Sequence, residues 1–319
     1  MAEVDSEKQN SDLIGRLQRA VGAVADLGAD FNHHQRRLAD LADRVAEGRF
    51  HLAVLGQFKR GKSTLLNALV GEDILPVGVV PLTAAPTFIE YGPRPGVRVN
   101  YCDERPAEEL ADAATARARE FLAEFVTEAA NPENRRGVAE VHVELPAPIL
   151  SGKVVLIDTP GIGSTYRHNT LATLNFLENC DAALFLVSAD PPITEVELEF
   201  LRQVRRKVPR LFFVLNKIDY LDARELEEAL AFYRRVLCEQ AECDPDHPVY
   251  CVSARRGLES RLAGDLAAWK ESGMERLESF LVDFLARRKL DALGDAVSRR
   301  ALDLIDAVWK TSAGACCRT

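Results

Sequence analysis

One run of residues constrains the fold of this chain more than any other feature: Gly56-Gln57-Phe58-Lys59-Arg60-Gly61-Lys62-Ser63-Thr64. It follows an apolar stretch at 50–55 and precedes a helical pattern at 65–69, so it joins a strand to a helix. The spacing G-x-x-x-x-G-K-S in this setting is typical of a loop that holds phosphates with backbone N–H groups and a helix N-terminus. The alternative is an ordinary glycine-flanked turn before a helix. We predict nucleotide contacts from Gly56, Lys59, Arg60, Gly61, Lys62, Ser63 and Thr64, with Lys62 on the β- and γ-phosphates and Ser63 on Mg²⁺.

Short apolar runs alternate with helical patterns from residue 50 to residue 272. This alternation predicts an α/β fold with a mostly parallel sheet and helices on both faces. Strands are expected at 51–55, 86–91, 97–102, 139–144, 153–157, 182–188, 211–215 and 249–252. Helices are expected at 62–70, 107–129, 170–177, 195–206, 223–240 and 259–269.

Apolar residues at helical spacing also run through 11–47 and through 277–308. We therefore expect an N-terminal helix within 1–49, an α/β domain at 50–272, and a C-terminal helix with a short tail at 273–319. The two end helices are predicted to pair in a small bundle. The alternative is that each packs separately on the sheet.

Composition narrows the class of partner and the compartment. The net charge of −9 and the pI near 5.3 argue against a broad basic surface, so no nucleic-acid partner is expected. The first residues lack the pattern of a signal peptide, and no apolar stretch has membrane-spanning length. Seven scattered cysteines fit reduced thiols. We expect a cytoplasmic protein, with peripheral association at a membrane as a further possibility.

A second motif follows the apolar strand 153–157: Asp158-Thr159-Pro160-Gly161. A carboxylate at a strand end can hold Mg²⁺ through water, and the glycine can place a backbone N–H against a γ-phosphate. Thr83 lies between the two motifs, where its hydroxyl can reach Mg²⁺ and its backbone the γ-phosphate; Thr87 is the competing candidate. The predicted metal set is Ser63, Thr83 and Asp158.

A third motif, Asn216-Lys217-Ile218-Asp219, follows the apolar run 212–215. The carboxylate of Asp219 can accept hydrogen bonds from N1–H and N2–H₂ of guanine, and adenine has no such pair of donors. The Lys217 stem would cover the face of the base. The alternative is that Asp219 caps a helix. After the last strand, backbone groups of Ser253 and Ala254 are placed to meet the guanine O6, so the expected ligands are GTP or GDP with Mg²⁺.

In this order, the motifs resemble those of the TRAFAC-class P-loop GTPases. Residues 56–69, 75–87 and 158–165 look more narrowly like the GTPase domain of bacterial dynamin-like proteins. A long interval between Thr83 and Asp158 leaves room for an extra segment at 92–150, which small Ras-like domains lack. The resemblance implies GTP hydrolysis, a nucleotide-dependent homodimer across the GTPase face, and membrane-associated remodelling. The long stalk of dynamin-type proteins is not seen in this sequence, so membrane contact is expected through parts absent from it.

Two neighbouring cations of the loop are candidates for the source of catalytic charge. Ile162 follows Gly161, where a Ras-like domain has a glutamine that positions water. Lys59 occupies a loop position at which two similar families carry other residues. Guanylate-binding proteins carry an arginine finger in this loop, and potassium-activated GTPases carry an asparagine. Lys59 is therefore a candidate for built-in charge compensation, with Arg60 second, and the alternative is that both side chains are solvated. The candidate catalytic residues are Thr83, Lys59 and Gly161.

Two other function classes share these motifs. One is a ribosome-assembly or RNA-associated GTPase, which usually carries a basic RNA-binding module that is not visible here. The other is a nucleotide-dependent binding module without meaningful turnover. Both are alternatives to a self-assembling GTP hydrolase.

Overall fold

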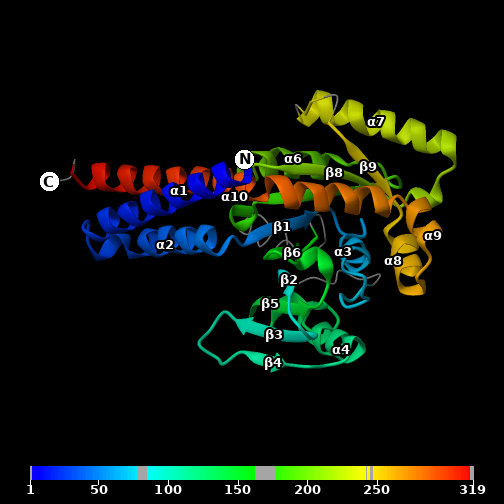
Figure 1. Ribbon diagram of the computed structural model, residues 1–319, viewed down its shortest axis with the longest axis horizontal. Helices are drawn as coiled ribbons and strands as arrows, with labels where there is room; N and C mark the ends of the chain where they lie inside the picture. Colours follow the sequence, from blue (N-terminus) through cyan, green and yellow to red (C-terminus); the bar gives the residue numbers. More distant parts are fainter. Residues whose placement is uncertain (1, 78–84, 162–176, 242, 245–246, 317–319) are drawn as a thin grey trace. The chain divides into compact units, whose positions relative to one another are not determined.

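The computed structural model describes residues 2–77, 85–161, 177–241, 243–244 and 247–316 (Figure 1). The chain divides into two compact units. The helical unit is Met1–Phe50 with Asp283–Thr319, and the α/β unit is His51–Val282.

One sheet organises the α/β unit, and within the described residues its strand order is β4-β3-β5-β2-β6-β1-β7-β8-β9. The strands are β1 (Phe50–Leu55), β2 (Thr87–Tyr91), β3 (Gly96–Tyr101), β4 (Glu108–Leu110), β5 (Val138–Leu145), β6 (Val154–Asp158), β7 (Ala182–Ser188), β8 (Leu211–Asn216) and β9 (Val249–Val252). Strands β1, β7, β8 and β9 pair in parallel, as do β2 and β5. Antiparallel pairs join β2 to β6, β3 to β5 and β3 to β4. The prediction of an α/β fold with a mostly parallel sheet is therefore confirmed.

The central strands form because their sequences are continuous apolar runs that can be buried on both faces. Every residue of β7 is buried, and β8 is buried from Phe212 to Asn216. Phe200, Leu201 and Val204 of helix α6 join the same core from one face of the sheet. Packing in this core holds the ends of β7 and β8 in fixed positions.

Within the described residues, the helices of the α/β unit besides α10 are α3 (Lys62–Val70), α4 (Thr115–Val126), α6 (Glu195–Lys207), α7 (Ala223–Ala241), α8 (Ala254–Ala263) and α9 (Leu266–Glu271). Helix α3 lies beside α8, and α6 beside α7 (Figure 1). Helix α10 (Met274–Cys316) contributes its residues up to Val282 to this unit. There Phe280 stacks on Tyr250 of β9, with ring centroids 4.7 Å apart.

Two helix predictions in this unit were wrong. The segment 107–129 begins as strand β4, which pairs with β3, and its helix starts only at Thr115. The segment 259–269 is two helices, α8 and α9, and Asp265 caps the second by accepting from the N–H groups of Ala267 and Ala268. The helix expected at 170–177 lies outside the described residues except for Leu177, which begins a short 3₁₀ turn.

The helical unit contains α1 (Ala2–Ala25), a 3₁₀ turn at Ala29–Phe31, α2 (Asn32–Glu47) and the rest of α10. The prediction of one helix over 11–47 was wrong, because the chain turns at Gly28, whose φ is 103°. Helices α1 and α2 pack side by side. Asn10 of α1 donates a hydrogen bond to the Leu290 carbonyl of α10 at 3.3 Å. The N- and C-terminal helices therefore belong to one unit. Its buried apolar residues include Leu17, Leu38, Val45, Leu293 and Val297.

Among the described residues, no helix is both long enough and apolar enough to cross a lipid bilayer.

Candidate functional site

The sequence motifs meet at one edge of the sheet. Strands β1, β7, β8 and β9 run in the same direction, so their carboxyl ends lie together. The loop Gly56–Gly61 leaves the end of β1, and Asn216 ends β8. Ser253 follows β9 and caps α8 by accepting from the Arg256 N–H. Asp158 is the last residue of β6, the strand next to β1.

Lys62 lies inside the loop that precedes it. Its Nζ donates to the carbonyl oxygens of Gly56 at 3.2 Å and Gln57 at 3.4 Å, and the side chain is buried. Burial lowers the pKa of Lys62, and the negative charges of Asp158 and Glu197 partly offset that effect. A buried ammonium whose partners among the described residues are carbonyl oxygens is well suited to the oxygens of a phosphate group.

Two side chains that carry hard oxygen atoms lie together beside the loop. The Ser63 hydroxyl donates to Oδ2 of Asp158 at 2.6 Å. The next residue, Thr159, donates its hydroxyl to the Val54 carbonyl at 2.7 Å and so holds the end of β6 against β1. A hydroxyl and a carboxylate in contact fit Mg²⁺, which prefers oxygen ligands. Thr83, the third predicted ligand, lies outside the described residues.

Gly161 brings the chain after β6 against the loop. A Cβ built on Gly161 would lie 2.9 Å from Cα of Phe58 and 3.0 Å from Nζ of Lys62. Only a glycine permits this approach without displacing backbone. The backbone at Gly161 is therefore close to the cation that would meet the terminal phosphates.

Asn216 links the loop to the start of α8. Its Nδ2 donates to the Arg60 carbonyl at 2.8 Å, and its Oδ1 accepts from the Ala254 N–H at 3.0 Å. A Cβ on Gly61 would lie 2.5 Å from Nδ2 of Asn216, and the φ of Gly61 is 93°. Both facts require glycine at that position. One side-chain amide of the third motif thus connects the phosphate-binding loop to the residues that follow β9.

The carboxylate of Asp219 lies next to this link and is 4% exposed. Its Oδ1 accepts from the Ser253 hydroxyl at 2.7 Å, and its Oδ2 accepts from Nη2 of Arg255 at 3.2 Å. The alternative role of helix cap belongs to Asp222, which accepts from the Glu225 N–H in the first turn of α7 at 2.8 Å. Lys217 precedes Asp219 with a φ of 64°, and partial burial lowers the pKa of its ammonium.

The two neighbouring cations of the loop have different surroundings. Lys59 is exposed, with a φ of 67° and its Nζ 5.4 Å from the Phe58 ring centroid. Arg60 is 2% exposed and forms an ion pair with Glu197 of α6 at 2.6 Å. The Arg60 guanidinium is thus engaged by a carboxylate, which the sequence reasoning did not foresee. The Thr194-x-x-Glu197 pattern signals a helix start, but no sequence pattern identifies Arg60 as its partner.

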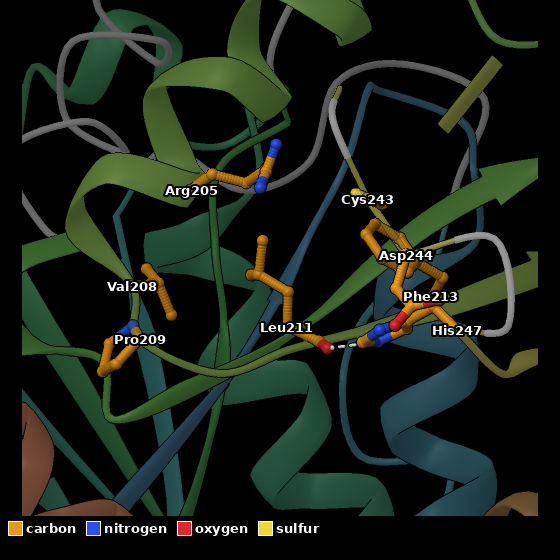
Figure 2. Close-up of a pocket in the computed structure, with 8 residues that line it drawn as sticks. All are labelled: Arg205, Val208, Pro209, Leu211, Phe213, Cys243, Asp244 and His247. Atoms are coloured by element: carbon orange, nitrogen blue, oxygen red, sulfur yellow. Dashed lines mark hydrogen bonds between the residues drawn. The ribbon is translucent and has the colours of Figure 1, made fainter. Parts of the chain in front are cut away.

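A separate cavity of about 240 Å³ lies at the other end of β8 (Figure 2). Leu211, the first residue of β8, lines it together with Arg205 and His247. The Nε2 of His247 donates to the Leu211 carbonyl at 3.0 Å. Because Asn216 ends the same strand, this cavity is not part of the site formed by the motifs.

Comparison with known proteins gives the same picture. Residues 52–218 match the sequence model of the dynamin family. A protein from the xynA 3′ region of Caldicellulosiruptor sp. (strain Rt8B.4) is 37% identical over 253 residues, which cover 78% of this chain and 60% of that protein. The bacterial dynamin-like protein of Nostoc punctiforme is 30% identical over 265 residues, or 77% of this chain and 38% of the relative. Dynamin-like protein 2 of Campylobacter jejuni is 34% identical over 258 residues, or 80% and 38%.

The fold is also found among solved structures. A chain of an oligomerised bacterial dynamin pair superimposes with a TM-score of 0.60 at 20% identity, covering 94% of this chain and 56% of that one. The matched part of the present chain therefore spans between 38% and 60% of the length of these relatives. From the family match over 52–218 and the arrangement of its motifs, the chain belongs to the dynamin family, and its α/β unit is a GTPase domain of that family.

Proposed function

We propose that this chain binds GTP with Mg²⁺ at the loop Gly56–Thr64 and hydrolyses it. The observation that carries this proposal is the Asn216 amide, which bonds both the Arg60 carbonyl and the Ala254 N–H. This bridge brings the loop that would hold phosphates next to the carboxylate that would select the base.

At the phosphate end, Lys62 would contact the β- and γ-phosphates, while Ser63 and Asp158 would hold Mg²⁺. When bound, Mg²⁺ supplies positive charge to the phosphate oxygens. Thr83 is proposed to contribute its hydroxyl to the same metal. Backbone groups of Thr83 and Gly161 would orient the attacking water, because Ile162 provides no polar side chain for that task.

At the base end, Asp219 would accept hydrogen bonds from N1–H and N2–H₂ of guanine. Its carboxylate currently accepts from Ser253 and Arg255, so it is already oriented for donors on two sides. Lys217 would lie along the base, and the backbone at Ser253 and Ala254 would meet O6. The nucleotide contacts are completed by Gly56, Gly61 and Thr64 of the loop.

Charge compensation is assigned to Lys59. Hydrolysis develops negative charge at the bridge between the β- and γ-phosphates, and a cation close to that bridge stabilises it. Lys59 is exposed in the loop, whereas the charge of Arg60 is paired with Glu197. A lysine in this position would make hydrolysis independent of potassium.

A second part of the proposal concerns the self-assembly of this chain and its location in the cell. The solved relative is described as an oligomerised bacterial dynamin pair in the long-range sensing and tethering of membranes. By analogy, we propose that this chain forms a nucleotide-dependent homodimer through its GTPase face. It would reside in the cytoplasm and act peripherally at a membrane surface.

Replacing Asp219 tests the base assignment. Asp219→Asn should weaken GTP binding about a hundredfold and strengthen binding of xanthosine triphosphate, because xanthine has a carbonyl where guanine has an amino group. Asp222→Asn is the matched control, since it neutralises a nearby carboxylate that caps α7. Kd values and hydrolysis rates with both nucleotides give the answer. Unchanged preference in Asp219→Asn would refute the assignment, and salt-sensitive RNA binding by the wild type would instead favour an RNA-associated GTPase.

A further inference from the structure

We propose that Arg60 and Glu197 are a positioning pair, which holds the phosphate-binding loop in its binding conformation by anchoring it to the start of α6. The inference rests on the proposed function, because the anchored loop is the one assigned to the phosphates of GTP. It assigns a structural role to Arg60, which the sequence placed among the nucleotide contacts, and to Glu197, which lies in none of the motifs.

The pair is fully buried and bidentate. Arg60 and Glu197 are 2% and 0% exposed. Nε of Arg60 donates to Oε1 of Glu197 at 2.8 Å, and Nη2 donates to Oε2 at 2.6 Å. Two parallel hydrogen bonds between a planar guanidinium and a carboxylate fix orientation as well as distance.

The rest of the guanidinium holds the turn after β7. Nη1 donates to the Ser188 hydroxyl at 2.5 Å and to the Pro191 carbonyl. Nη2 also donates to the Pro192 carbonyl at 3.2 Å and to Oε1 of Gln57 at 3.3 Å. A lysine could not reproduce this set, because its ammonium lacks the rigid fork.

Glu197 is itself held by the first turn of its helix. Its Oε2 accepts from the Thr194 N–H at 2.9 Å and from the Thr194 hydroxyl at 3.0 Å. The Glu197 N–H in turn donates to the Thr194 hydroxyl at 3.4 Å, which completes a capping box. Arg60 is therefore tied to a side chain whose own position is fixed by a regular element.

Both the side chain and the main chain of Arg60 are restrained. Its carbonyl accepts from Asn216 at 2.8 Å, and its N–H donates to the Gln57 carbonyl at 3.4 Å. The loop is thereby fixed between α6 on one side and the end of β8 on the other. Backbone N–H groups that bind phosphate must converge on one point, so a loop fixed in advance binds more tightly than a mobile one.

If Arg60 and Glu197 acted on the nucleotide through their charges alone, the two substitutions would change nucleotide affinity in a different way. Removing the guanidinium would leave an unpaired carboxylate near the phosphates, which would repel them. Removing the carboxylate charge would leave an unpaired guanidinium, which would attract them. A charge role therefore predicts opposite effects for the two substitutions, whereas a positioning role predicts weaker binding for both.

The test compares Arg60→Met with Glu197→Gln in the full chain. The matched control is Glu278→Gln, which breaks the bidentate pair between Arg261 and Glu278, at 3.2 and 2.6 Å, away from the loop. Kd values for GDP and a GTP analogue, KM and kcat for GTP, and hydrogen exchange of the loop amides without nucleotide would be measured.

Both Arg60→Met and Glu197→Gln should raise the Kd and KM about tenfold or more and speed exchange of the Gly56–Lys62 amides. The kcat at saturating GTP should fall less than about threefold, because neither group is assigned to the reacting atoms. Glu278→Gln should keep wild-type nucleotide affinity and loop exchange. Opposite shifts in affinity for the two variants, or wild-type affinity and exchange in either, would overturn the inference.

If either variant fails to fold, as judged by circular dichroism, Arg60→Lys decides. It keeps the charge but loses the fork, so the same weaker binding and faster loop exchange are expected. Wild-type behaviour of Arg60→Lys would overturn the inference. If the wild-type chain did not bind guanine nucleotides, the proposed function would fail, while the exchange of the loop amides would still test the anchor.

Discussion

At the scale of single residues, Lys59 and Arg60 show how neighbours with the same charge can lie in different surroundings. Lys59 is exposed in a left-handed conformation with φ at 67°. Arg60 is buried against Glu197. The loop spacing predicted the glycines and Lys62, but it could not separate these two cations, because Glu197 is 137 residues away in the sequence.

Replacing Lys59 tests its assigned role. Lys59→Gly removes the cation and suits the left-handed backbone, so the loop should keep its shape. We expect kcat at saturating GTP to fall about tenfold or more, because charge at the phosphate bridge is no longer compensated. GDP affinity should change less than about threefold. The measurement is phosphate release in potassium and in sodium buffers.

Lys59→Arg is the conservative control, and it should retain most of the turnover. Wild-type turnover should be equal in the two buffers. A Lys59→Gly variant with wild-type kcat would contradict the role, and water positioning by the backbone near Gly161 would then carry the reaction.

At the scale of elements, continuous apolar runs were the most reliable guide. The bounds predicted for β7 and β9 are those observed, because both strands are buried among neighbouring elements. Glu108–Leu110 could not be predicted as a strand, since nothing in Glu-Glu-Leu indicates pairing with Val97–Val99. Likewise, the helical spacing over 11–47 continues past Gly28 and hides the turn there.

One cross-strand cluster makes stability depend on pH. His142 of β5 lies 3.0 Å from Glu90 of β2 and 3.2 Å from Glu140, and it stacks on Phe88 with ring centroids 4.9 Å apart. Burial alone would lower the pKa of His142, but the hydrogen bonds to Glu140 and Glu90 outweigh it and raise the pKa to about 9. The protonated imidazolium is therefore the form that stabilises the sheet.

The sign of the effect follows from the raised pKa. Stabilisation by His142 is fully present below the ordinary pKa of 6.5 and is lost as the pH rises through about 9. His142→Gln should lower the free energy of unfolding by about 1–3 kcal/mol near pH 6 and by much less near pH 10. Chemical denaturation of both proteins at the two pH values measures this difference. An equal loss at both values would show that the histidine acts through packing alone.

At the scale of the whole molecule, the chain consists of two units, and the match to the dynamin family lies in the α/β unit. The α/β unit holds every described motif residue, and the helical unit combines α1 and α2 with most of α10. The sequence predicted helices at both ends of the chain but not that the first would be a hairpin. The match covers 38% of the length of each of two bacterial dynamin-like relatives.

Self-association is the property to measure at this scale. If GTPase faces pair, turnover per chain should rise with protein concentration, because the active species is then a dimer. Light scattering after size exclusion should show a dimer with a GTP analogue or a transition-state mimic and a monomer with GDP. Negligible turnover at all concentrations would favour a nucleotide-dependent binding module.

The Asn216 amide has a consequence for how the site discriminates among ligands. Because Nδ2 and Oδ1 bond the loop and the start of α8 at once, either end can be disturbed only by disturbing the other. In the proposed nucleotide site, the amide would therefore fix the spacing between the groups assigned to the base and those assigned to the phosphates. A ligand with the right base but a different spacing to its phosphates would then bind less tightly, because it could not reach both ends of the site at once.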